Sequence, residues 1–144
     1  MLEKACPPLG RLLLSTIFLM SAVNKVMNWN QTDERMSSQG MPLVSLLLVG
    51  AILFEFCGGL SVLLGWRARF GAGLLVVFLI PTTLIFHDFW TFEGQERQMQ
   101  MINFMKNTSI LGGLLLVIGL GPGSVSLDAR RTGSTHSSPA HTSQ

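Results

Sequence analysis

Charged side chains are scarce in this chain of 144 residues. Only 12% of the residues are Asp, Glu, Lys or Arg, whereas 48% are hydrophobic. A soluble domain carries about 25% charged residues. The low charge, together with apolar residues gathered in long blocks, excludes a water-soluble globular domain and indicates a polytopic membrane protein. The net charge of +2, without a basic cluster interleaved with aromatic residues, gives no support for a nucleic-acid partner.

Cysteine and histidine are equally sparse, with two cysteines and three histidines in the chain. Cys6 precedes the first apolar run and Cys57 lies inside the second, so we expect no disulfide between them. Neither belongs to a Cys-x-x-Cys pair, which argues against a dithiol centre. Two of the histidines lie beyond residue 120, so no metal or haem site is predicted. The sequence also has no nucleotide fingerprint and no Ser-His-acid arrangement.

Four apolar runs are long enough to cross the ~30 Å hydrocarbon core of a bilayer as helices. They cover residues 9–29, 42–64, 70–88 and 101–120. Continuous apolar runs of this length predict helices, because only helices and closed barrels span lipid. We therefore predict an all-α, four-helix transmembrane bundle in residues 1–120. Residues 121–144 lack apolar content and are expected to form a disordered polar tail.

The distribution of lysine and arginine predicts the orientation of the bundle. With four spans, the two termini and the turn between the second and third spans share one side of the membrane. That side carries six basic residues: Lys4, Arg11, Arg67, Arg69, Arg130 and Arg131. The other side carries four: Lys25, Arg35, Arg97 and Lys106. Because the basic side faces the cytoplasm, we expect both termini there.

Glu55 stands near the centre of the second span, in the run Met41 to Trp66. A charge at this depth costs at least ~2.5 kcal/mol on insertion scales, so an intramembrane carboxyl needs a partner, a proton or a water-filled cavity. Glu55 lies ~13 Å from the inner end of its helix at the usual helical rise. Arg11 sits near that inner end on the first span and can reach toward the midplane. We expect Arg11 to be the partner of Glu55.

Further polar residues should also face the interior of the bundle, because lipid would penalise them. One face of the first span carries a polar and small-residue stripe of Arg11, Ser15, Phe18, Ala22 and Lys25. His87 ends the third span, and Lys106 and Asn107 lie early in the fourth. Two interpretations stay open for the Glu55–Arg11 pair. It is either a structural ion pair that fixes helix register or part of a functional site.

The polar residues and their surroundings resemble those of the DoxX family of small four-helix bacterial membrane proteins. The resemblance covers nearly all of residues 9–120 and rests on GRLLLSTIFLMSAVNKVMNW, EFCGGLSVLLGWRAR, FHDFW and NFMKNTSILGGLLL. Its most specific part is an acid followed by Gly-Gly and then by Leu-Gly before a basic turn. Carried over residue by residue, the family's characteristic polar positions are Arg11, Lys25, Glu55, His87, Lys106 and Asn107. The resemblance implies a location in the bacterial cytoplasmic (inner) membrane and an association with membrane oxidoreductase complexes.

Two main hypotheses follow. The first is a redox-linked subunit that binds quinone between its helices, with Glu55 exchanging a proton and oxidoreductase subunits as partners; whether the chain is itself an enzyme stays open. Under this hypothesis Arg11 or Lys106 tunes the pKa of Glu55. Lys106, Asn107 and His87 can hydrogen-bond a carbonyl oxygen near the outer interface. The alternative is a non-catalytic scaffold or assembly factor that holds a partner through residues 66–69 or 91–100. Transport of a small solute ranks last, since it would require a homo-oligomer.

Overall fold

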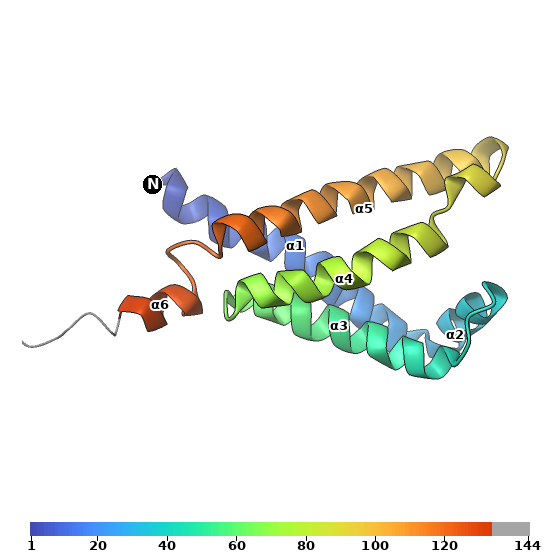
Figure 1. Ribbon diagram of the computed structural model, residues 1–144, viewed down its shortest axis with the longest axis horizontal. Coiled ribbons are helices and arrows are strands. Elements are labelled where there is room, and N and C mark those ends of the chain that lie inside the picture. The colour runs from blue at the N-terminus through green and yellow to red at the C-terminus, as the bar shows by residue number, and fades with distance from the viewer. Residues whose placement is uncertain (134–144) are drawn as a thin grey trace, which may run out of the picture.

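The computed structural model describes residues 1–133, which contain helices and no strand (Figure 1). Four long helices are apolar enough to cross a membrane, which confirms the predicted all-α four-helix transmembrane fold. The elements in chain order are α1 (Leu2–Met27), α2 (Trp29–Ser38), α3 (Val44–Leu64), α4 (Ala68–Phe86), the short 3-10 helix η1 (Phe89–Thr91), α5 (Gly94–Leu120) and α6 (Leu127–Gly133).

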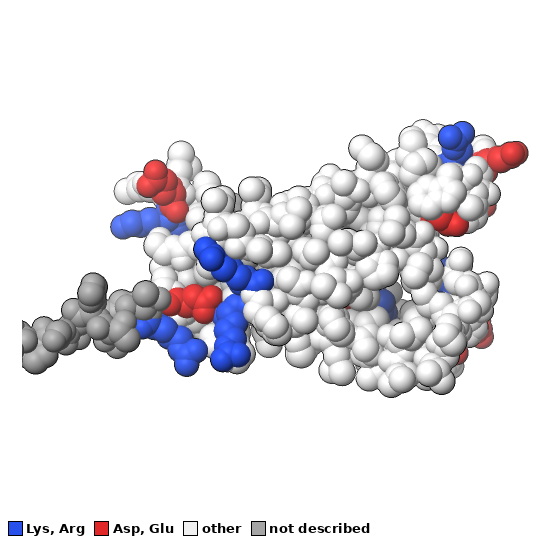
Figure 2. Space-filling model, in the orientation of Figure 1, with Lys and Arg blue, Asp and Glu red and all other residues white. Residues whose placement is uncertain are grey.

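Charged side chains gather at the two ends of the molecule, and a band free of charge separates them on the face shown in Figure 2. The outward surface of the long helices is apolar, with exposed residues that include Leu53, Phe56, Val77 and Leu116. Soluble proteins rarely expose apolar patches of this extent. The band therefore fits the hydrocarbon core of a lipid bilayer.

The bundle interior runs through α1, α3, α4 and α5 in that order. The buried residues of α1 are Arg11, Ser15, Phe18 and Ala22, which confirms the predicted stripe on this helix. Further along the core lie Val62 of α3, Leu75 and Leu79 of α4, and Leu114 and Val117 of α5. Each helix thus turns one face to the interior, which on α1 includes the polar residues Arg11 and Ser15, and leaves the remainder to lipid.

The helices are not evenly spaced around the bundle. α1 and α5 come close where Gly113 faces Leu14, because a Cβ on Gly113 would lie 2.9 Å from Leu14 Cδ2. Toward the end that carries α2 and η1, α5 diverges from α3 (Figure 1). At that end Figure 2 shows a hollow between α2 and the end of α4, with a basic side chain visible inside it. The end of the bundle that carries α2 and η1 is therefore more open than the end that carries α6.

The structure differs from the sequence-based predictions in three places. The connection between the first two predicted spans contains an additional helix, α2, and α5 begins at Gly94, well before the predicted fourth span at 101–120. Residues 121–133, predicted to be disordered, are ordered and include α6. The remainder of the predicted tail, residues 134–144, lies outside the described residues.

Glycine allows α3 and α4 to cross closely, and this yields a first prediction. A Cβ on Gly58 would lie 2.7 Å from Leu75 Cγ and 3.1 Å from the carbonyl oxygen of Gly71. We expect Gly58→Ala to lower the free energy of unfolding by about 1–3 kcal/mol through overpacking. Gly50→Ala on the same helix is the control, because nothing lies within 4 Å of its added Cβ. Equilibrium unfolding in detergent measures both, and equal stabilities would contradict the close crossing.

Candidate functional site

A buried ion pair joins Lys25 of α1 to Glu55 of α3. Lys25 Nζ lies 2.9 Å from both Oε1 and Oε2 of Glu55, and it also donates to Ser21 Oγ at 2.6 Å. Ser21 Oγ in turn donates to Glu55 Oε1 at 2.9 Å. The side chain of Glu55 is 4% exposed and that of Lys25 is 20% exposed. These three residues, here called the intramembrane triad, satisfy both carboxylate oxygens within the chain.

The antiparallel packing of α1 against α3 positions the intramembrane triad. Small residues set the register, since a Cβ on Gly59 would lie 3.2 Å from Leu19. This pairing brings Ser21 level with Glu55. Lys25 follows Ser21 by one helical turn on the same face. Side chains lean toward the N-terminus of their helix, so Lys25 reaches back one turn to meet the carboxylate.

Arg11 is not the partner of Glu55, so that prediction is wrong. Arg11 precedes Ser21 by ten residues, which places it ~15 Å further along the helix at the usual rise per residue. It lies level with Gly65 at the end of α3, where an added Cβ would be 2.6 Å from Arg11 Nη1. The guanidinium donates instead to the carbonyl oxygens of Pro122 and Val125, the latter at 2.8 Å. The helix register thus separates the two buried charges.

The contacts of Arg11 fasten residues 122–128, here called the C-terminal latch, to the bundle. The carboxylate of Asp128 accepts hydrogen bonds from the backbone N–H groups of Arg67 at 2.8 Å and Ala68 at 3.1 Å. It therefore caps the N-terminus of α4, where backbone donors have no partner within the helix. The backbone N–H of Asp128 donates to the carbonyl oxygen of Gly65 at 2.9 Å. These long-range contacts order a segment whose own composition predicts disorder.

The other predicted site residues do not join the intramembrane triad. His87 Nδ1 lies 2.8 Å from Gln100 Oε1, near the outer ends of α4 and α5. Lys106 is exposed and donates to Asn103 Oδ1 at 3.1 Å. Asn107 is buried, and its side-chain amide donates to Thr83 Oγ1 at 3.0 Å. These positions therefore form separate polar contacts along α4 and α5.

Apolar surface surrounds the polar groups of the bundle. The ring of Phe78 on α4 faces Lys25, with 5.9 Å between Nζ and the ring centroid. The Asn107–Thr83 pair borders a cavity of about 110 Å³ whose other walls include Leu79 and Phe104. Within residues 1–133, no group of three or more His, Cys, Asp or Glu residues is placed to hold a metal ion. Both polar sites therefore lie in largely apolar surroundings.

The partners in these contacts that were not predicted from the sequence include Ser21, Thr83, Gln100 and Asp128. Ser21 had a usable signal, since it precedes Lys25 by four residues and so shares its helical face. Thr83 lies two residues after Pro81 in an apolar run, and only the packing of α4 against α5 shows its pairing with Asn107. Asp128 had no local signal, because its partners lie 60 residues or more away in the chain.

Comparison with known proteins gives a consistent result. The DoxX family model matches residues 7–88, a range that contains Arg11, the intramembrane triad and His87. The inner membrane protein YphA of Escherichia coli (strain K12) is 34% identical over 122 residues, which cover 85% of this chain and 87% of YphA. The inner membrane protein YqjF of the same organism is 36% identical over 119 residues, covering 83% of this chain and 86% of YqjF.

A more distant relative is eukaryotic. A Surfeit locus protein 4 homolog of Drosophila melanogaster is 27% identical over 124 residues, covering 85% of this chain but only 39% of that protein. No solved structure matches the chain. The two bacterial relatives and the four candidate spans confirm the predicted location: the protein is a multi-pass protein of the bacterial cytoplasmic membrane.

Proposed function

Because the chain belongs to the DoxX family, we propose that it is a redox-linked subunit of a membrane oxidoreductase and that it binds quinone beside the intramembrane triad. The observation that carries this proposal is the triad itself. A carboxylate and an ammonium are held in the middle of an apolar bundle, and the ammonium is partly exposed. Buried ionisable residues inside a membrane typically mark ligand or proton pathways.

The chemistry of the triad fits a quinone. Lys25 makes two bonds to one carboxylate, so its ammonium can give one of them up to a quinone carbonyl oxygen. Reduction of a quinone takes two electrons, which a partner oxidoreductase subunit supplies in this proposal, and one proton for each oxygen. In this proposal Glu55 takes up a proton from water and passes it to one quinone oxygen, and water supplies the proton for the other oxygen. The apolar walls, including Phe78, suit the ring and the isoprenoid tail.

Titration of quinone into the reconstituted protein tests the proposal. The wild-type chain in lipid nanodiscs should bind ubiquinone or menaquinone. Glu55→Gln should weaken binding roughly tenfold or more, since the neutral amide no longer holds the Lys25 ammonium in place for the quinone oxygen. Lys106→Met is the matched control, because this exposed lysine bonds to Asn103 on its own helix, away from the triad. Unchanged quinone affinity in Glu55→Gln would overturn the assignment of the triad.

One observation favours the alternative of a non-catalytic scaffold or assembly factor. Both oxygens of Glu55 find their donors inside the chain, as expected for a pair that fixes helix register. In that case Glu55→Gln would fold and would bind as much quinone as the wild type, yet would no longer retain a partner during purification. The nanodisc titration therefore separates the two functions.

A further inference from the structure

A second site lies at the end of the bundle that carries α6, far from the intramembrane triad. A hollow of about 480 Å³ is lined there by Trp66, Leu127, Arg130 and Arg131. Two of these residues are apolar and two are cationic, so apolar and positively charged surface lie next to each other in the hollow. We infer that it binds the headgroup of an anionic phospholipid, such as phosphatidylglycerol.

The C-terminal latch holds the two arginines beside Trp66. Asp128 is bonded to the start of α4, directly after the turn that contains Trp66. Ser126 Oγ accepts a hydrogen bond from the backbone N–H of Ala129 at 3.1 Å, and the carbonyl oxygen of Ser126 accepts one from the backbone N–H of Arg130 at 3.3 Å. The first turn of α6 is therefore held in two ways: Asp128 bonds it to the start of α4, and Ser126 bonds to the backbone of the turn itself. Arg130 and Arg131 follow at defined positions rather than on a free tail.

The charge around this hollow is complementary to a phosphate group. The exposed residues at this end of the bundle include four arginines: Arg67, Arg69, Arg130 and Arg131. The guanidinium of Arg67 lies 5.9 Å from the ring centroid of Trp66, which extends the cationic border of the hollow. The only acid in residues 121–133 is Asp128, whose carboxylate accepts from the backbone of α4. Basic pockets at the cytoplasmic side of membrane helices suit anionic lipid headgroups.

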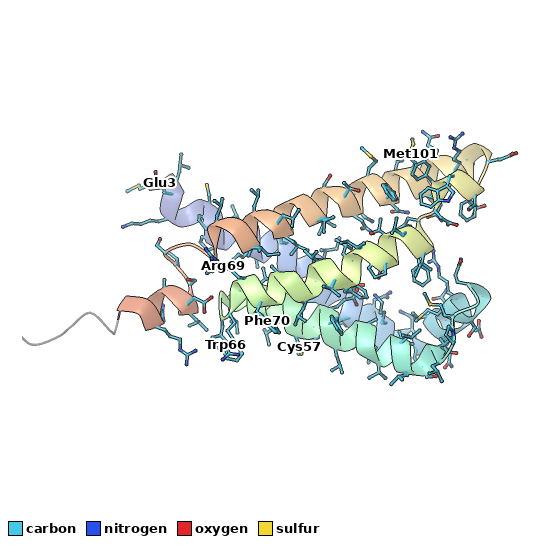
Figure 3. The ribbon with its side chains drawn as sticks, viewed as in Figure 1. Glu3, Cys57, Trp66, Arg69, Phe70 and Met101 are labelled. Carbon is cyan, nitrogen blue, oxygen red and sulfur yellow. The ribbon has the colours of Figure 1, made fainter. Side chains whose placement is uncertain are left out.

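The apolar half of the hollow distinguishes a lipid from a soluble anion. Trp66 follows the end of α3 by two residues, and it points away from the bundle on the side where Cys57 and Phe70 also face outward (Figure 3). Tryptophan at a span end lies at the level of the headgroups. Trp66 and Leu127 can cover the glycerol and the first part of the acyl chains, while the arginines meet the phosphate. Inorganic phosphate would leave this apolar surface unused.

Fluorescence quenching of Trp66 by brominated lipids tests the inference. The double substitution Trp29→Phe/Trp90→Phe leaves Trp66 as the sole tryptophan of the full chain. This protein is reconstituted into phosphatidylcholine vesicles that contain a small fraction of brominated phosphatidylglycerol or of brominated phosphatidylcholine. We expect brominated phosphatidylglycerol to quench Trp66 roughly twofold or more strongly, because it gathers at the arginines. Equal quenching by the two lipids would overturn the inference.

Two variants and one competitor sharpen the test. Arg130→Gln/Arg131→Gln should abolish the preference for the anionic lipid, whereas Arg97→Gln, which removes a cation from the opposite end of the bundle, should keep it. If the parent protein and both variants have the same thermal unfolding midpoint, the lost lipid preference does not result from unfolding. A preference that survives in Arg130→Gln/Arg131→Gln would contradict the site. So would loss of the preference when inorganic phosphate is added at constant ionic strength, because the site would then accept a soluble anion.

Discussion

Lys25→Met should lower the free energy of unfolding by about 3–5 kcal/mol, because it leaves the buried carboxylate of Glu55 without its counter-charge. The side chain of Glu55 is only 4% exposed, so water cannot replace the ammonium. Ser21 alone would remain as a donor to this carboxylate. Equilibrium unfolding in mixed detergent, followed by circular dichroism, measures the change.

Two further variants show whether the loss comes from the unpaired charge. Lys106→Met removes a lysine that is exposed, and it should change stability by no more than about 0.5 kcal/mol. Lys25→Met/Glu55→Gln removes both charges and should recover most of the stability lost in Lys25→Met, since neutral pairs often replace buried ion pairs at little cost. A double variant as unstable as the sum of its single variants would show that the two residues do not interact.

Arg11→Met should destabilise the protein by about 2–4 kcal/mol, because two hydrogen bonds from a charged donor are lost and their carbonyl acceptors remain. Arg11 is buried, with 5% of its surface exposed, and it holds the carbonyl oxygens of Pro122 and Val125. The C-terminal latch should also loosen. Hydrogen exchange measured by mass spectrometry should show faster exchange in residues 122–133 than in the wild type.

Arg69→Met provides the comparison for Arg11→Met. Arg69 is exposed and makes one long hydrogen bond, 3.4 Å from Nη2 to the carbonyl oxygen of Gly119. Its loss should change stability by less than about 0.5 kcal/mol and leave exchange in the latch unaltered. If residues 122–133 exchanged hydrogen as slowly in Arg11→Met as in the wild type, Arg11 would not be the residue that holds the latch.

Hydropathy alone was enough to predict the fold, because lipid forces a continuous apolar run to be helical. It also identified the buried face of α1, where polar and small residues recur at helical spacing. The partner of Glu55 was not predictable in the same way. Choosing between Arg11 and Lys25 requires the register of α1 against α3, which depends on close contacts such as that of Gly59 with Leu19. At the usual helical rise, Arg11 and Lys25 lie ~21 Å apart along α1.

The C-terminal latch escaped prediction for a related reason. Its composition has too little apolar surface to order the segment by itself. The stabilising partners are Arg11 and the backbone N–H groups at the start of α4, which lie far away in the chain. Contacts of this kind depend on the tertiary arrangement and leave no mark in local sequence. The two buried charged residues of the bundle thus make different contacts. Glu55 pairs with Lys25 at mid-membrane, and Arg11 binds the C-terminal latch at the end of the bundle.

Purification in mild detergent from the native membrane, followed by mass spectrometry of every co-purifying molecule, tests the central claim most directly. The wild-type chain and Lys25→Met/Glu55→Gln, which should remain folded, are compared side by side. We predict that quinone, or a subunit that carries a flavin or a haem, accompanies the wild type and that the quinone is lost from the double variant. Wild-type protein that carries phospholipid alone, or a double variant that keeps its quinone, would contradict the assignment of a redox role to the triad.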